Sequence, residues 1–122
     1  MVKLVEMDDK VPFSAQMEEK VGPIIVISKF NMNPEDVDQF LKEWASGAEI
    51  MKRQPGFIST QLHRGIAGSS VFVNYAVFES TEHFMRASNN PEFQSKLTQY
   101  PASIVVSPHI FKKVAVSGIC VD

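Results

Sequence analysis

The sequence predicts an α+β fold in which helices cover one face of an antiparallel sheet. Two runs rich in β-branched and aromatic residues, over residues 24–30 and 71–78, have the length of strands and are too short for helices. Between them, apolar residues recur at the spacing of an amphipathic helix. The elements follow one another in the order β-α-β-β-α-β, which builds a four-stranded antiparallel sheet.

The first half of the chain contains an arm, a strand and a long helix. Residues 1–22 show no sustained hydrophobic period, so we expect an arm with a short helix over residues 14–20. Residues 24–30 form the first strand. Asn33 then caps a helix with Pro34 at its first position, where the missing N–H costs nothing. This helix ends at Pro55-Gly56, and its predicted buried stripe consists of Val37, Phe40, Leu41, Trp44, Ala48 and Met51.

The second half supplies three strands and two short helices. Residues 58–64 form the second strand, and residues 71–78 form a third that is apolar at nearly every position. Ser80 caps the next helix, and Asn90-Pro91 starts a further short one. After an irregular stretch to Pro108, the last strand is expected over residues 109–116. The resulting order is that of a ferredoxin-like sheet.

Composition excludes several classes of function. The 122 residues suit one domain, and a net charge of -2 without a basic run argues against nucleic-acid binding. No stretch is apolar enough for a membrane span. A single cysteine, Cys120, can form neither an internal disulfide nor a thiolate metal site. These features predict a cytoplasmic protein.

The apolar strands predict a second copy of the chain. In a ferredoxin-like sheet the helices cover one face only, yet residues 24–27 and 71–77 are apolar on both faces. An uncovered apolar face in water marks an interface. We therefore expect a homodimer formed through the sheet faces, with two-fold symmetry.

Histidines are the first candidates for acid–base chemistry, because imidazole titrates near neutral pH. By alternation, His63 shares a strand face with Ser59 and Gln61, and the alternative is that this is only the polar face of a partly exposed strand. His83 and His109 are expected to be structural. The three histidines show no metal-ligand spacing, and no glycine-rich loop leads into a helix. We therefore expect no metal and no nucleotide cofactor.

Asn74 is the one amide in an eight-residue apolar strand. A buried amide must find partners, so it either bonds to neighbouring backbone or holds the oxygen of a ligand. Phe78 lies on the same strand face, and Trp44 and Phe40 lie on the helix stripe that should face it. These aromatic residues are either plain core or the lining of a small apolar pocket, whereas Tyr75 points toward the partner chain.

Three segments, "QPGF", "NYAVFES" and "SPHIFKKVAV", together resemble the antibiotic biosynthesis monooxygenase (ABM) family. The resemblance covers residues 23–117, leaving an arm over residues 1–22 and a tail over residues 118–122. Members of that family are dimeric α+β barrels. The arm is expected to lie on the neighbouring subunit.

Cofactor-free members of the family oxidise polycyclic phenols to quinones, and the resemblance extends to their site residues in part. Asn74 matches their strand Asn, while Phe78 stands in place of a Trp and Phe84 in place of a Tyr. Haem-degrading members carry a first-strand Asn, the Trp and a His on the last helix. Here Ile27 or Ser28 lies near the first of these positions, and "FQSKL" contains no His, which argues against haem degradation.

The leading hypothesis is a cofactor-independent monooxygenase that oxidises a phenol-like or quinol-like compound with O2. Asn74 would hold the substrate oxygen, and His63 would act as base if it turns inward. The ring would be enclosed by Trp44, Phe40, Phe78 and Phe84. The alternative is a non-catalytic binding or stress-response protein of the same fold.

Overall fold

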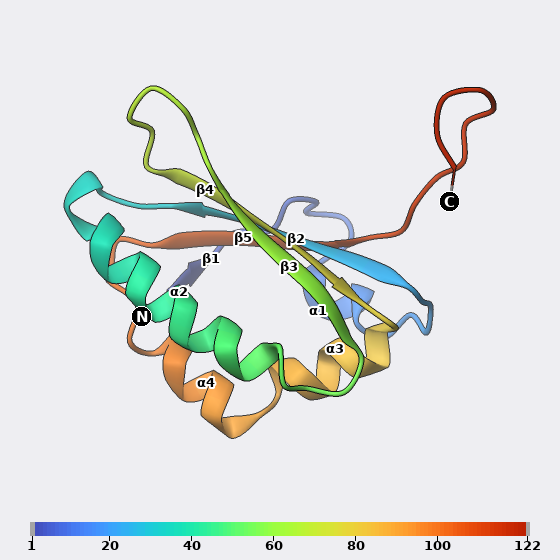
Figure 1. The fold of residues 1–122 in the computed structure, drawn as a ribbon, viewed down its shortest axis with the longest axis horizontal. Helices are drawn as coiled ribbons and strands as arrows, with labels where there is room; N and C mark the ends of the chain where they lie inside the picture. Colours follow the sequence, from blue (N-terminus) through green and yellow to red (C-terminus); the bar gives the residue numbers. More distant parts are fainter. Residues whose placement is uncertain (1, 122) are drawn as a thin grey trace.

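A computed structural model describes residues 2–121 and shows a five-stranded sheet in the order β1-β5-β2-β4-β3 (Figure 1). The strands are β1 (Lys3–Leu4), β2 (Ile24–Asn31), β3 (Phe57–Arg64), β4 (Val71–Phe78) and β5 (Val105–Phe111). Strands β2 to β5 pair antiparallel, as predicted, and β1 pairs parallel with β5. The ferredoxin-like α+β fold is confirmed, with one extra edge strand that comes from the arm.

Three helices lie on one face of the sheet (Figure 1). They are α2 (Val37–Met51), α3 (Thr81–Ser88) and α4 (Pro91–Leu97). Ser80 caps α3 as predicted, accepting the His83 N–H at 3.1 Å. Asn33, in contrast, makes no side-chain cap, because a 3-10 turn over Pro34–Asp36 precedes α2 and delays its start.

The predicted last strand was misplaced. It runs over Val105–Phe111, not over residues 109–116, because Phe111 already pairs with Ile25, and β2 has only one residue, Ile24, beyond that pair. Pro108 had suggested irregular backbone. Two residues to either side of it, the Val106 carbonyl and the Ile110 N–H bond to the arm, on the side of β5 that faces away from β2. Because backbone groups two residues apart point the same way, an N–H at position 108 would also point away from β2. The proline therefore removes no hydrogen bond between β5 and β2.

The arm packs against its own domain. Its short helix α1 (Phe13–Gln16) is shorter than predicted and sits beside β5. The Gln16 side-chain amide bonds to both backbone groups of Ile110: it accepts the N–H at 2.9 Å and donates to the C=O at 2.9 Å. The side chain thereby takes the place of a neighbouring strand.

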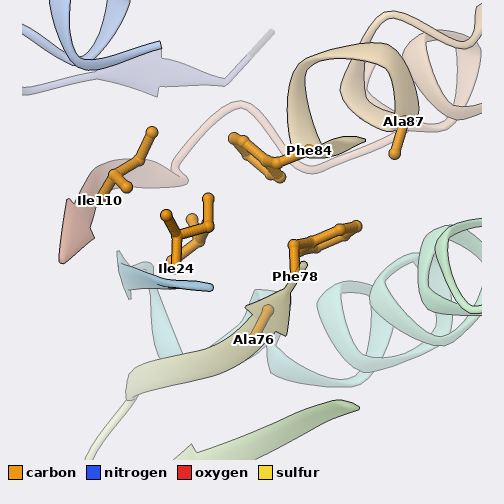
Figure 2. Packing of buried hydrophobic residues seen from close by; sticks show 7 residues of the cluster. Ile24, Ala76, Phe78, Phe84, Ala87 and Ile110 are labelled. Atoms are coloured by element: carbon orange, nitrogen blue, oxygen red, sulfur yellow. The ribbon is translucent and has the colours of Figure 1, made fainter. Parts of the chain in front are cut away.

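The buried core consists of two clusters. The first, shown in Figure 2, consists of Ile24, Val26, Ala76, Phe78, Phe84, Ala87 and Ile110. The second consists of Phe30, Val37, Phe40, Phe72, Tyr100 and Ile104. Between the two, Ser28 on β2 lies directly opposite Asn74 on β4. This polar pair interrupts the apolar side chains on the helix-facing side of the sheet.

The other face of the sheet has an apolar centre on β2 and β4, which no helix within residues 2–121 covers. Ile25, Ile27, Val73 and Val77 are half-buried there, and Tyr75 is 38% exposed. Helices α2, α3 and α4 all lie on the opposite side (Figure 1).

A substitution of Gly56, in the turn between α2 and β3, is expected to lower the stability of the protein. Gly56 has φ of +86°, and a Cβ there would collide with the ring of His83. We expect Gly56→Ala to lower the free energy of unfolding by about 2–4 kcal/mol, through left-handed strain plus the collision.

Gly68→Ala is the matched control. Gly68 has φ of +76° but nothing within 4 Å of an added Cβ, so only the strain of about 1–2 kcal/mol should remain. Urea unfolding of both variants measures the difference, and equal losses would contradict a tight contact between the turn and α3.

Candidate functional site

A cavity of about 320 Å³ lies between the helices and the sheet, above the polar pair. This is the size of a small-molecule pocket at the lower end of the usual range. Its lining is mainly apolar and aromatic, with a few polar groups from β2, β3 and β4 on the sheet side and with Ser88, Asn89 and Gln94 on the helix side. Such a composition suits a compact, mostly apolar ligand that carries a small number of polar atoms.

Asn74 provides the oriented polar group of the cavity. The Thr60 hydroxyl donates a hydrogen bond of 2.6 Å to Asn74 Oδ1. The Asn74 Nδ2 donors have no partner among the side chains and backbone of residues 2–121. Since Oδ1 is occupied by Thr60, the amide presents N–H groups, and Ser28 lines the cavity beside it. The site can therefore donate hydrogen bonds to a ligand oxygen.

Aromatic rings form the apolar part of the lining. Phe78 meets Phe57 and Phe84 edge-on, with ring centroids 5.6 Å and 5.2 Å apart. Figure 2 shows Phe84 extending from α3 toward Ile24 and Ile110. Trp44 and Met51 line the cavity from α2. Aromatic rings in these arrangements offer faces and edges against which a planar ligand can pack.

Four of the predicted site residues come together at the cavity: Asn74, Trp44, Phe78 and Phe84. Phe40 does not line it. Its ring is fully buried in the second cluster, where it stacks on Tyr100 with centroids 5.6 Å apart. The spacing of apolar residues along α2 predicts which side of the helix is buried. It does not predict which residues on that side pack in the core and which line a cavity, and this is why Phe40 was expected in the lining.

His63 is also removed from the site. Thr60 and Leu62 point toward the helices, so alternation places His63 on the opposite, exposed face. There its Nδ1 lies 3.3 Å from the Val73 carbonyl oxygen. The cavity therefore receives no base from β3.

Sequence reasoning missed several lining residues. Ser28 and Thr60 follow from strand alternation, since they share their strand faces with Val26 and Leu62. Their short side chains gave no reason to single them out. Four arm residues also line the cavity: Val2, Leu4, Phe13 and Met17. No periodicity in the arm indicated that it folds back in this way.

Tyr100 is the one ionisable side chain in the lining formed by residues 2–121. Burial raises the pKa of its phenol, and the nearby carboxylate of Glu43 raises it further. Tyr100 therefore keeps its proton at neutral pH. Within the same residues, no cluster of His, Cys, Asp and Glu could hold a metal ion, and no helix is long and apolar enough to cross a membrane.

Comparisons with known proteins place this site in context. Residues 23–96, more than half of the chain, match the family described as antibiotic biosynthesis monooxygenase. Among solved structures, the chain is similar to SnoaB, a cofactor-independent oxygenase from Streptomyces nogalater, with a TM-score of 0.70 and 24% identity over 80% of this chain and 99% of that one. A comparison with curated proteins gives no match.

Two further solved structures share the fold at lower identity. PA3566 from Pseudomonas aeruginosa has a TM-score of 0.68 and 16% identity, covering 78% of this chain and 97% of its own. Rv0793 from Mycobacterium tuberculosis has a TM-score of 0.66 and 14% identity, covering 80% of this chain and 100% of its own. At these identities the likeness concerns the fold.

The environment of Tyr100 predicts an alkaline loss of stability. Unfolding restores the ordinary tyrosine pKa of 10.0, whereas the folded protein holds the proton to higher pH. Above pH 10 only the unfolded state releases this proton, so the free energy of unfolding should fall as pH rises.

Tyr100→Phe removes that contribution and should flatten the decline. Urea unfolding at pH values on either side of 10 measures it. Val11→Ala, which changes an exposed arm residue and removes no ionisable group, is the control and should keep the decline of the wild type. An identical decline in all three proteins would contradict the buried environment of Tyr100.

Proposed function

Because the chain belongs to the antibiotic biosynthesis monooxygenase family, we propose that it oxidises a small phenol-like or quinol-like aromatic compound with O2, without an added cofactor. The observation that carries the proposal is the Thr60–Asn74 hydrogen bond, which leaves an oriented amide N–H available in a mainly apolar cavity. The similarity to SnoaB, described as a cofactor-independent oxygenase, supports the cofactor-free form of the reaction.

The proposed role of Asn74 is to hold the substrate oxygen as negative charge develops on it. A phenolate or enolate oxygen accepts a hydrogen bond from Nδ2, while Thr60 keeps the amide from rotating. Phe78 and Phe84 pack against the ring, and Trp44 contacts it from α2. An amide fixed in advance stabilises the anion without reorganisation, which favours reaction at the ring carbon.

The reaction balances with the substrate as the sole reductant. The anion's ring carbon forms a bond to O2 and gives a peroxide. The O–O bond then breaks, one oxygen stays on the ring as a quinone carbonyl, and the other leaves as water. For a phenol with a free para position, phenol plus O2 gives quinone plus water, and the ring supplies all four electrons.

The lining restricts the substrate class. It offers no carboxylate, imidazole or amine among residues 2–121, and Tyr100 stays protonated. Substrate ionisation must therefore rest on the compound's own acidity, helped by Asn74. Anthrones, naphthols and hydroquinones, whose anions are delocalised, fit this requirement.

The same lining favours a second candidate function. Tyr100, the one ionisable side chain in the lining formed by residues 2–121, keeps its proton, and such a cavity can bind an aromatic compound and leave it unchanged. The protein would then act as a binding or stress-response protein. Turnover separates the two functions, because both predict binding and only one predicts O2 uptake.

Asn74 variants test the proposal. With 1-naphthol or anthrone as substrate, Asn74→Ala should lower kcat by about 100- to 1,000-fold, the cost of removing an oxyanion donor. Thr60→Val should cost about five- to tenfold, the equivalent of one neutral hydrogen bond. O2 uptake and quinone absorbance measure turnover.

Lys42→Ala, on the exposed side of α2 and away from both the cavity and the apolar sheet face, is the control and should behave as wild type. Circular dichroism checks that each variant is folded. Turnover that survives Asn74→Ala would refute the proposed role. No turnover in the wild type with any member of the panel would favour the binding function.

We also propose that the apolar face of the sheet pairs with a second copy of the chain. The support is the row of half-buried aliphatic residues around Tyr75, a patch of the kind that marks interfaces. The cytoplasmic location indicated by the composition stays a prediction.

A charge placed in this face should separate the copies. We expect Tyr75→Glu to convert a dimer into a monomer in light scattering coupled to gel filtration, because a carboxylate would be buried unpaired. Ala45→Glu, on the exposed side of α2, carries the same new charge and should remain dimeric. A wild-type monomer would overturn this proposal.

A further inference from the structure

The arm contributes one side of the cavity, although it lies outside the matched region. The family match begins at residue 23. Yet Val2, Leu4, Phe13 and Met17 all line the cavity, together with Ser28, Asn74 and residues of the helices. The part of the chain shared with the family therefore leaves this side of the pocket to be supplied by the arm.

Specific bonds hold the arm in that place along its length. Lys3 N–H donates to the Ile104 carbonyl at 3.1 Å, and Val5 N–H to the Val106 carbonyl at 2.9 Å. In the middle, the Gln16 amide bonds to Ile110.

The end of the arm is anchored to α3. Thr81, which is 1% exposed, donates its hydroxyl to the Glu19 carbonyl at 2.6 Å and accepts the Val21 N–H at 3.2 Å. These contacts fix the backbone on both sides of α1, so its side chains present a defined surface to the cavity.

Two arm side chains suit contact with an aromatic ring. The Phe13 ring meets Phe84 edge-on, with centroids 5.9 Å apart, and so extends the aromatic lining across to the arm. Met17, packed against the same cluster, offers a polarizable thioether that favours aromatic contacts. Both residues lie on the side of the first cluster, whereas the Asn74 amide lies between the clusters.

We infer that the arm is the specificity-determining wall of the pocket: Phe13 and Met17 set how large an aromatic ring system can bind while its oxygen reaches Asn74. This inference rests on the proposed function in assuming an aromatic ligand with one oxygen. It does not require that the ligand be oxidised. Shortening either side chain should enlarge the pocket on the arm side and leave the polar contact intact.

A size series of hydroxyarenes tests the inference: 1-naphthol, 9-phenanthrol and 1-hydroxypyrene. Each carries one hydroxyl, and their fluorescence reports binding to the full chain under argon, where no oxidation occurs. The wild type should prefer the smallest ring system. Phe13→Ala and Met17→Ala should each shift the affinity ratio of 1-hydroxypyrene to 1-naphthol by at least about tenfold toward the larger compound.

Control variants separate pocket shape from stability. Val11→Ala changes an exposed arm residue that does not line this cavity, and it should keep the wild-type ratio. If Phe13→Ala fails to fold, Phe13→Leu replaces it, and a smaller shift in the affinity ratio is expected. If Met17→Ala fails to fold, the same variant is measured at a lower temperature. An unchanged ratio in folded variants, or equal changes for all three compounds, would overturn the inference.

Oxygen then distinguishes this inference from the proposed function. If the ratio shifts but the wild type consumes no O2 with 1-naphthol, the arm sets specificity in a binding protein, and the monooxygenase proposal fails alone. If O2 is consumed while the ratio stays fixed, the inference fails alone. If none of the three compounds binds to the wild type, both are wrong.

Discussion

The structure depends on the placement of a polar pair in the middle of an apolar sheet. Ser28 and Asn74 face each other across β2 and β4, where side chains on either side belong to two separate apolar clusters. An apolar core could close over two more aliphatic residues at this point. If the core closed over a serine and an amide, it would bury hydrogen-bond donors without partners. Each such donor would cost about 1–3 kcal/mol of stability. The helices instead span a cavity, and the two clusters on either side supply the rigidity that keeps it open.

Much of this arrangement could be predicted from sequence because it depends on local patterns. Strand alternation placed Asn74 and Phe78 on one face, and helical spacing placed Trp44 on the side of α2 that faces them. Ser80 and Asn90 follow a strong local preference and cap their helices as expected. In each case one short segment contains all the information required.

The parts that could not be predicted depend on contacts between distant segments. Whether Phe40 packs in a core or lines a cavity is decided by Phe30, Phe72 and Tyr100, which close around it. The bounds of β5 are decided by the extent of its antiparallel partner β2, from Ile25 to Asn31, and Pro108 within β5 does not interrupt it. The arm is the clearest case: its position is fixed by bonds to residues sixty or more positions away, while its own sequence has no period.

The bond between Gln16 and Ile110 has a consequence for the behaviour of the protein at high concentration. Strand β1 covers only the start of β5, and a bare edge with free N–H and C=O groups is a template for another chain. The Gln16 amide occupies both backbone groups of Ile110, so the exposed edge is interrupted. Pro108 adds a second interruption, since it has no N–H to offer. The arm thus lines one side of the pocket and also covers this edge, so its removal would open the pocket and expose a template for aggregation at the same time.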